Sequence, residues 1–458
     1  MGSARSWDAS GVVLVLAWLL AGLALVKVWR AGENAPGIDY YEFWVAVEAV
    51  RVQAVPDIYA EPAKAVLAER YLKEEVVPPV GRAVSARQQA VARATPGIGI
   101  MGTPVLHATL SLLQRGDYNE DIGRFQLAGL AAFAAGVMLL GRAYKMPLAW
   151  PLLALAWLAM FYGPLASDVH AANVNRWQLG MVGLEAWLLA GAEKRGRCAL
   201  AGAVLAFAVL FKPNVGLGAL LLVWHWAWAR RWKRLGWFAG GAAAAGVATL
   251  IGSAIFFGSF GCWENWLAMT GQVEYSTFPV KEGNFSLAEV VFAWTGVRLG
   301  MGPAVVFVGG ALAAVAMAAV RGRGRTEGSV MAGEAWASGP EPGLLAVGCA
   351  LWMLVAQLAW FHYFLLVVPL ILWALRPALG GTAGCGGWWL AQRVAAVLVL
   401  VVLNPVVIGA MLPLSPWAWP LLLNVVVAVL VAVVLGEMVN AEFRMQNIEL
   451  KVVGESEK

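Results

Sequence analysis

Long apolar runs, separated by short polar or basic stretches, dominate the chain. A membrane-spanning helix needs about 20 apolar residues to cross the hydrocarbon layer. Runs close to that length are 10–28, 124–141, 146–164, 177–192, 236–257, 301–320, 343–359, 393–411 and 418–436. The first run lacks a small-x-small cleavage site and continues into Lys27 and Arg30, so we interpret it as a retained anchor.

Residues 198–229 form an apolar stretch that Lys212-Pro213-Asn214 interrupts, with basic clusters at 193–197 and 230–234. If both clusters lie on one side of the membrane, the stretch must cross and return. Each arm then has only about 15 residues, which is short for a crossing. The pattern therefore predicts that Lys212 lies just inside the far face, in a cavity lined by protein.

Two further segments complete the predicted organisation. Residues 362–376 form another short arm, and residues 98–114 are interpreted as a re-entrant or interfacial segment. The sequence thus predicts an all-α integral membrane protein with about 12 spans. Its single domain, 1–436, contains a long first loop (29–123) and a disordered linker (321–342), and a polar tail (437–458) follows.

The first loop is expected to contain amphipathic helices. One follows Asp39 as far as Val55, and the other covers 62–75 and is expected to lie on the membrane surface. Asp57 is predicted to form a turn with an N-cap before the second helix.

Charge distribution predicts the orientation. With the N-terminus in the cytoplasm, the cytoplasmic segments hold 18 Lys and Arg residues, whereas the outer segments beyond the long first loop hold four. Positive charge favours the cytoplasmic side. We therefore expect both termini in the cytoplasm, an extracytoplasmic first loop, and a multi-pass protein of the plasma (inner) membrane.

Composition excludes several classes of protein. Hydrophobic residues make up 60% of the chain and charged residues 13%, too few charges for a soluble surface. The 24 Trp residues suit membrane interfaces. The four Cys show no metal-binding spacing, and the net charge of +5 is explained by basic loops rather than by nucleic-acid binding. No cofactor is expected, although one carboxylate and scattered Asn could hold a divalent ion loosely.

With this orientation, polar residues from separate segments share the outer face. They are Asp39, Asp57, Asp168, His170, Asn173, Asn175, Lys212, Asn284 and His362. Asp39, among aromatic residues after the first run, is interpreted as a helix N-cap or as a functional carboxylate, and the two are compatible. Residues 168–178 are expected to form a short outer loop that suits a sugar or a phosphate.

Three polar residues carry competing interpretations. Lys212 either meets a lipid phosphate or snorkels to the interface. His362 is either functional or a hydrogen-bonded structural residue. Glu185 lies in the middle of a predicted span, where a carboxylate is costly, and it either has a function or pairs with a neighbouring helix.

A set of short motifs in a consistent order resembles glycosyltransferase family 87, a branch of the GT-C membrane glycosyltransferases. The motifs are Asp39-Tyr40, Asp57-Ile58-Tyr59, Thr103-Pro104, Gly116-Asp117-Tyr118, Gln178, Lys212-Pro213, Asn284-Phe285-Ser286-Leu287 and His362-Tyr363. The chain has Arg176-Trp177-Gln178-Leu179 where the family often has Gly-Gln-x-Asn.

The resemblance implies a GT-C-type helical bundle that transfers a hexose, usually mannose, from a polyprenyl-phosphate donor. Transfer would occur on the extracytoplasmic side with inversion, to a glycolipid or glycan acceptor. Asp39 would be the catalytic aspartate. Such a reaction needs one general base and cationic stabilisation of the leaving phosphate.

We therefore expect Asp39 to act as the base and Lys212 to bind the phosphate with help from Arg176. His362 would either contact the phosphate or orient Asp39. Candidates for contacts with sugar or acceptor are Asp168, His170, Asn173, Asn175, Gln178 and Asn284.

Two other functions are open at this stage. A transporter or flippase of a lipid-linked glycan would explain many spans and an outer polar cavity. It would, however, place polar groups on both faces of the membrane. A non-catalytic scaffold would leave Asp39, Lys212 and His362 unexplained.

Overall fold

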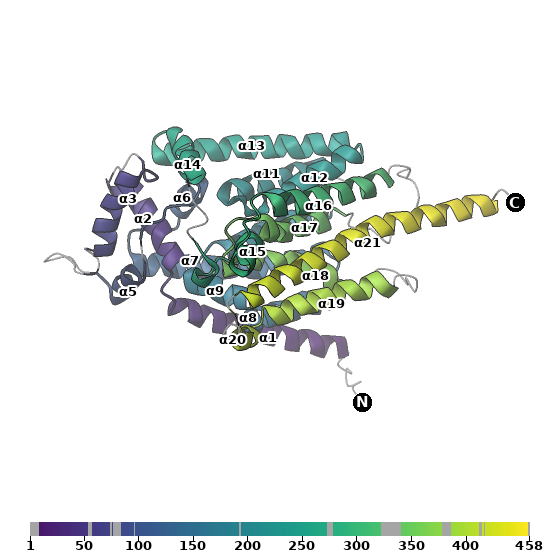
Figure 1. Ribbon diagram of the computed structural model, residues 1–458, viewed down its shortest axis with the longest axis horizontal. Helices are drawn as coiled ribbons and strands as arrows, with labels where there is room; N and C mark the ends of the chain where they lie inside the picture. Colours follow the sequence, from purple (N-terminus) through teal and green to yellow (C-terminus); the bar gives the residue numbers. More distant parts are fainter. Residues whose placement is uncertain are drawn as a thin grey trace, which may run out of the picture.

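The computed structural model describes residues 9–53, 57–73, 76, 84–95, 97–191, 194–272, 278–321, 340–377, 386–411, 415 and 417–456. These residues form helices and loops without a strand, apart from one antiparallel bridge between Asn284 and Trp360. Long helices lie side by side along the longest axis of the molecule, and short helices form a cap at one end (Figure 1).

Five of the described helices are long and apolar enough to cross a membrane alone. They are α1 (Ala9–Glu33), α7 (Tyr118–Ala143), α13 (Trp232–Phe257), α16 (Gly302–Arg321) and α21 (Ala418–Ser456). Two bent pairs raise the number to seven: α8 (Ala149–Phe161) with α9 (Gly163–Ala171) at 65°, and α19 (Gly386–Val402) with α20 (Pro405–Met411) at 67°.

The remaining predicted spans correspond to shorter helices. They are α10 (Asn175–Leu189), α11 (Arg195–Phe211), α12 (Gly216–Trp228), α17 (Glu341–Val355), and the 3₁₀ turn η7 (Phe361–Val367) with α18 (Val368–Leu375). The predicted all-helical membrane architecture is confirmed at this level. The total of about 12 spans stays a prediction, because these helices are shorter than a full crossing.

The apolar stretch 198–229 breaks where the sequence indicates. α11 ends at Phe211, and η2 (Pro213–Val215) leads into α12. Lys212 lies between them with an extended backbone (φ −159°). Pro213 lacks an N–H and cannot continue the hydrogen-bond ladder of α11. The sequence therefore places a lysine at a helix break rather than within a helix.

The cap contains α2 (Ile38–Gln53), α3 (Glu61–Ala68), the π-helix η1 (Glu69–Lys73), α5 (Ala86–Ala94) and α6 (Pro104–Leu110). In Figure 1 it lies at the end opposite the start of α1 and the end of α21, and α14 (Gly261–Gln272) lies beside it. Between α14 and α16 the chain forms η4 (Val280–Glu282) and α15 (Leu287–Thr295). Asp57 forms the predicted turn by accepting from the Tyr59 N–H at 2.9 Å, but the N-cap position of α3 belongs to Ala60.

Glycines let α7 and α10 pack with backbone in contact. A Cβ on Gly136 would lie 2.6 Å from the carbonyl oxygen of Leu179, and one on Gly180 would lie 2.9 Å from that of Ala132. α11 and α13 show the same close approach, with Gly241 against Ala199. Small residues are favoured between membrane helices because packing must replace a missing hydrophobic driving force.

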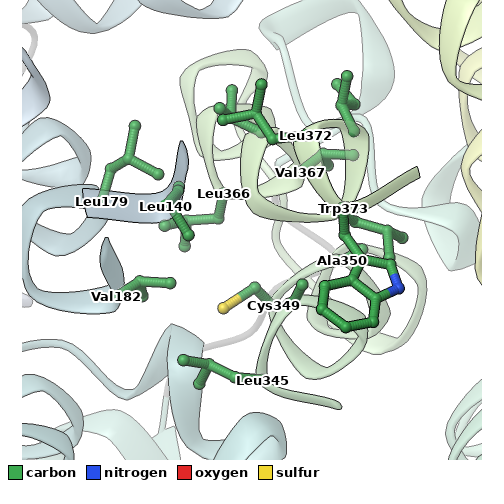
Figure 2. Close-up of a cluster of buried hydrophobic side chains, with 14 of the residues drawn as sticks. Leu140, Leu179, Val182, Leu345, Cys349, Ala350, Leu366, Val367, Leu372 and Trp373 are labelled. Carbon is green, nitrogen blue, oxygen red and sulfur yellow. The ribbon is translucent and has the colours of Figure 1, made fainter. Parts of the chain in front are cut away.

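Helices α7, α10, α17 and α18 share the apolar core of the bundle. Figure 2 shows Leu140, Val182, Cys349, Leu366 and Trp373 converging there. Each of these side chains is at most 2% exposed. This core fixes α10 and η7, and both elements carry residues of the polar site described below.

Ion pairs connect elements elsewhere in the bundle. The buried Glu341 carboxylate in the first turn of α17 accepts from Arg231 at 3.1 Å, from Trp226 Nε1 at 3.2 Å, and from Arg234. Arg376 pairs with Glu437 at 3.1 Å. Most of the predicted linker, residues 322–339, lies outside the described residues. The predicted polar tail continues α21 as helix to Ser456.

Gly241→Leu should destabilise the protein, because its side chain would meet the Ala199 backbone, which cannot rotate away. Overpacking typically costs about 1–3 kcal/mol. The measurement is the melting temperature of the detergent-purified protein. Gly240→Leu is the matched control, since nothing lies within 4 Å of a Cβ at Gly240. Equal melting temperatures for the two variants would contradict this account of the α11–α13 contact.

Candidate active site

A tight turn between α1 and α2 places Asp39. Gly37 adopts φ +75°, a left-handed conformation that favours glycine. Its N–H donates to the carbonyl of His170 at 3.2 Å, and the Tyr118 hydroxyl donates to the carbonyl of Pro36 at 2.9 Å. α2 begins at Ile38, so Asp39 lies within the first turn and the N-cap interpretation is wrong. Its carboxylate is available for contacts with other segments.

Asn173 connects Asp39 to the start of α10. α9 ends at Ala171, and its C-cap residue Ala172 is in the left-handed region (φ 54°). Asp168 is therefore helical, and the loop predicted over 168–178 is shorter than expected. Asn173 Nδ2 donates to Asp39 Oδ2 at 2.6 Å. Its Oδ1 accepts from the Val174 N–H at 2.7 Å. These two bonds fix the orientation of the amide.

Lys212 approaches the same amide from the break after α11. Its Nζ donates to Asn173 Oδ1 and to Asn175 Oδ1, each at 2.9 Å, and lies 4.0 Å from the centre of the Tyr363 ring. The Lys212 carbonyl accepts from Gln178 Nε2 at 2.8 Å. Among the described residues, the ammonium is thus held by two neutral amides and an aromatic face, and it makes no direct ion pair.

The cap is fastened to this break by Thr103. Its hydroxyl accepts from the Leu106 N–H at 3.1 Å, which caps α6, and donates to the carbonyl of Phe211 at 3.0 Å. Phe211 directly precedes Lys212, so the segment predicted to be re-entrant or interfacial sets the position of the lysine.

His362 reaches Asp39 from the start of η7. Its Nε2 lies 3.6 Å from Asp39 Oδ2, too far for a hydrogen bond, and has no hydrogen-bond partner in the described structure. The His362 carbonyl accepts from Asn175 Nδ2 at 3.3 Å. The arrangement brings Asp39, Lys212 and His362 together from three distant parts of the chain.

Burial and charge set the protonation of the two central groups. Burial raises the pKa of Asp39, while the Asn173 hydrogen bond and the Lys212 charge oppose that rise. Burial lowers the pKa of Lys212 to about 8, against the attraction of Asp168 and Asp39. Asp39 keeps 30% of its side chain exposed, and its Oδ1 has no hydrogen-bond partner among the described residues. Oδ1 is therefore the oxygen that can accept a proton.

A buried ion pair lies behind the cluster. Arg176 donates from Nε to Asp168 Oδ2 at 2.7 Å and from Nη2 to Gln126 Oε1 at 2.7 Å, and it is 1% exposed. The other Asp168 oxygen accepts from Asn175 Nδ2 at 3.0 Å. This geometry does not support the predicted phosphate contact of Arg176 or a sugar contact of Asp168. The pair instead holds Asn175, which holds Lys212.

Two other predicted site residues make no described contact with the cluster. The His170 side chain is exposed, and only its carbonyl contributes, by accepting from Gly37. Asn284 is fully buried and bonded through both polar atoms: Nδ2 donates to the carbonyls of Phe278 and Gln357, and Oδ1 accepts from the N–H groups of Ser286 and Ala359. Asn284 therefore positions the segment before His362.

Sequence reasoning missed Glu42 and Gln126. Glu42 lies one turn after Asp39 on α2, so both carboxylates share a helix face. Burial and the nearby Asp39 charge raise the pKa of Glu42 well above its usual value. The signal in the sequence was the spacing of three residues between Asp39 and Glu42, which puts two carboxylates on one face of a helix. For Gln126, the signal was a lone amide near the start of an apolar run.

Glu185 lies buried without a hydrogen-bond partner, and the described residues contain no metal-binding group. The Glu185 carboxylate is buried in α10, and neither oxygen has a hydrogen-bond partner in the described part of the chain, so the predicted pairing with a neighbouring helix is not found. Among the described residues, no group of three or more His, Cys, Asp or Glu could hold a metal ion.

Comparison with known proteins identifies the family. A family model described as Glycosyltransferase family 87 matches residues 103–346. No curated protein and no solved structure matches the chain. The match contains Asn173, Asn175 and Lys212 but neither Asp39 nor His362. It confirms the resemblance deduced from the short motifs: the chain belongs to glycosyltransferase family 87 and is a membrane glycosyltransferase.

Proposed function

We propose that this protein transfers a hexose, mannose in the first instance, from a polyprenyl-phosphate donor to a glycolipid or glycan acceptor with inversion. One observation carries the proposal. Asn173 lies inside the region that the family model matches and donates directly to Asp39, which lies outside that region. Lys212, also inside the matched region, is connected to Asp39 through the Asn173 amide. A base and a cation thus occupy one site in a chain whose family transfers sugars.

Asp39 acts as the general base. Its Oδ1 takes the proton of the acceptor hydroxyl as that oxygen bonds to the anomeric carbon. His362 Nε2 lies 3.6 Å from Oδ2, and it would orient the carboxylate by closing to hydrogen-bond distance when the substrates bind. The raised pKa of Asp39 makes it a stronger base than an exposed carboxylate. Such a site needs no second carboxylic acid, because a phosphate leaves without being protonated.

Lys212 stabilises the departing phosphate. The bond between the anomeric carbon and the phosphate oxygen breaks as the acceptor oxygen attacks from the opposite face, which inverts the centre. The negative charge that develops on the phosphate faces the Lys212 ammonium. Asn173 and Asn175 hold that ammonium and present amides that can also contact sugar hydroxyls. Gln178 acts through the Lys212 backbone.

The membrane arrangement belongs to the same proposal. A GT-C-type bundle of about 12 spans would place the cap and Asp39 on the extracytoplasmic face of the plasma membrane. Both termini would be cytoplasmic, as the charge distribution predicts. The polyprenyl tail would remain among apolar helices while its phosphate reaches Lys212 at the helix break.

Asp39→Asn should reduce transfer about 10²–10⁴-fold, the usual contribution of a general base, while donor binding stays near wild type. The assay uses purified protein, radiolabelled polyprenyl-phosphate mannose and a membrane lipid extract as the acceptor pool. Asp57→Asn, which alters only a turn in the same loop, is the control and should retain activity. A near wild-type rate for Asp39→Asn would refute the base assignment. Saturable donor binding without transfer by wild type would favour a flippase.

Lys212→Met should raise the KM for the donor about 10- to 100-fold, because a charge-assisted hydrogen bond contributes about 1.5–3 kcal/mol. The comparison is with Lys281→Met, which removes an exposed lysine from η4. Acceptor KM should change little in either variant. If the two substitutions affect the donor KM equally, Lys212 does not bind the phosphate.

The pH dependence of kcat/KM should be bell-shaped. Protonation of Asp39 lowers activity on the acid side, at a pH above the usual carboxyl range because the pKa of Asp39 is raised. Deprotonation of Lys212 lowers it above about pH 8. In Lys212→Met the acid limb should move to higher pH, because the charge that lowers the pKa of Asp39 is gone, and the alkaline limb should disappear. An unmoved acid limb would contradict the coupling of the two residues.

A further inference from the structure

Four residues near the start of α2 keep part of their surface exposed: Ile38, Asp39, Glu42 and Phe43. The other residues between 40 and 49 are buried. Positions three and four apart share one face of a helix, so the exposed residues form a single stripe that contains Asp39. The proposed transfer gives a role to Asp39 alone. Glu42 is thus a second carboxyl group on the same open face, and the reaction does not yet use it.

The Glu42 carboxyl group is only weakly held within the protein. Its Oε1 accepts from the Gly99 N–H at 3.5 Å, longer than an ordinary N–H···O bond. Its Oε2 makes no hydrogen bond or ion pair with any described residue. Lys64 on α3 is close enough to oppose the rise in the pKa of Glu42, but its ammonium pairs with Glu61 at 2.7 Å instead. One oxygen of Glu42 is therefore open to a ligand.

A loop of the cap, residues 97–102, borders this carboxyl group. A Cβ on Gly99 would lie 3.7 Å from both Glu42 carboxyl oxygens, so the loop backbone runs directly beside them. Tyr59 and Trp266 each donate to a carbonyl of the loop, at 3.0 Å and 3.1 Å. The loop is thus held on two sides, and it fixes one wall next to Glu42.

Asp39 and Glu42 face different parts of the molecule. Asp39 Oδ2 contacts Asn173 and lies 3.6 Å from His362 Nε2, and both of these residues belong to the bundle. Lys212 reaches the site from the same side. In the proposed reaction the phosphate leaves toward Lys212, and the acceptor oxygen attacks from the opposite face. The acceptor therefore enters beside the free Asp39 Oδ1, next to the cap loop and Glu42.

The spacing and chemistry of the two carboxyl groups suit two hydroxyls of one sugar ring. Residues three apart on a helix have Cβ atoms about 5–6 Å apart, so both side chains can reach the same ring. Because the pKa of Glu42 is raised, its carboxyl keeps a proton to higher pH than an exposed one. A protonated carboxyl both donates to and accepts from a hydroxyl, and it does not repel the Asp39 carboxylate. Ile38 and Phe43 offer apolar contact beside it.

A divalent cation fits this pair less well. Such an ion takes about six oxygen ligands or more. Within the described part of the chain, no third His, Cys, Asp or Glu completes a metal-binding group with Asp39 and Glu42. The Lys212 ammonium already acts on Asp39 with a positive charge. A hydroxyl needs only one partner here, and the experiment below distinguishes it from a metal ion.

We propose that Glu42 holds a second hydroxyl of the acceptor sugar while Asp39 Oδ1 takes the proton of the reacting hydroxyl. The acceptor is then a glycan or glycolipid whose reacting hydroxyl has another hydroxyl on the same ring, rather than a lone alcohol such as a serine side chain. Glu42 takes no part in making or breaking bonds; it binds and orients the acceptor. This inference rests on the proposed function, because it takes Asp39 as the base.

The test measures sugar transfer from saturating radiolabelled polyprenyl-phosphate mannose while the concentration of a membrane lipid extract, the acceptor pool, is varied. Glu42→Leu should raise the half-saturating extract concentration about 10-fold, the loss of one hydrogen bond, and leave the donor KM near wild type. Glu42→Gln, which still donates and accepts, should recover most of that loss. Glu69→Gln, an exposed carboxyl of η1 that pairs with Lys73, is the control and should behave as wild type.

A second pair of variants tests the same surface with Glu42 in place. Gly99→Val should also raise the half-saturating extract concentration, because its side chain would cover the Glu42 carboxyl group. Gly97→Val is the matched control, since nothing lies within 4 Å of a Cβ at Gly97. An unchanged donor KM in each variant shows that the site is folded.

Three results would overturn the inference. The first is wild-type dependence on the extract in both Glu42→Leu and Gly99→Val. The second is an equal loss of kcat in Glu42→Gln and Glu42→Leu, which marks a base. The third is loss of transfer on chelation that Mg²⁺ or Mn²⁺ restores in wild type but not in Glu42→Gln, which marks a metal ligand. Transfer that depends on Asp39 but not on Glu42 would spare the proposed function, whereas a wild type that transfers no sugar would overturn both.

Discussion

The site depends on two hydrogen bonds made by the side-chain amide of Asn173. The amide donates to the Asp39 carboxylate at 2.6 Å and accepts from the Lys212 ammonium at 2.9 Å. In a direct ion pair, each charge would be largely neutralised by the other. Asp39 would then be a weaker base, and Lys212 would stabilise a phosphate less. A neutral amide between them lets each charge stabilise the other through space while Asp39 Oδ1 stays available. Breaking such a buried arrangement would leave an uncompensated charge, which is strongly destabilising.

The polar residues reach this amide because they lie at helix ends. Asp39 lies in the first turn of α2, and His362 lies in the first turn of η7. Asn173 lies between α9 and α10, and Lys212 lies in the break between α11 and α12. Helix ends carry backbone groups without partners inside the helix, so polar side chains there are satisfied locally. Close packing of α7 on α10 and of α11 on α13, through glycine, then holds these ends in register.

Much of this arrangement was predictable from sequence, and the failures have physical causes. Apolar runs located the long helices, and Pro213 located the break at Lys212. The convergence of Asp39, Lys212 and His362 followed from orientation and family resemblance. Charge alone could not show that Arg176 pairs with Asp168 and Gln126, because that pair depends on how α7, α9 and α10 pack. For the same reason, Asn284 resembled a sugar contact although it fastens backbone, and Glu42 became visible only beside Asp39 on α2.

The central claim is that one site holds the base and the phosphate-binding cation on the two sides of the reacting sugar. A cryo-electron microscopy structure of Asp39→Asn with bound polyprenyl-phosphate hexose would test it most directly. We predict the phosphate within hydrogen-bond distance of Lys212 Nζ, and the anomeric carbon between that phosphate and the side chain at position 39. A donor phosphate bound away from Lys212, or a sugar that does not approach position 39, would contradict the account.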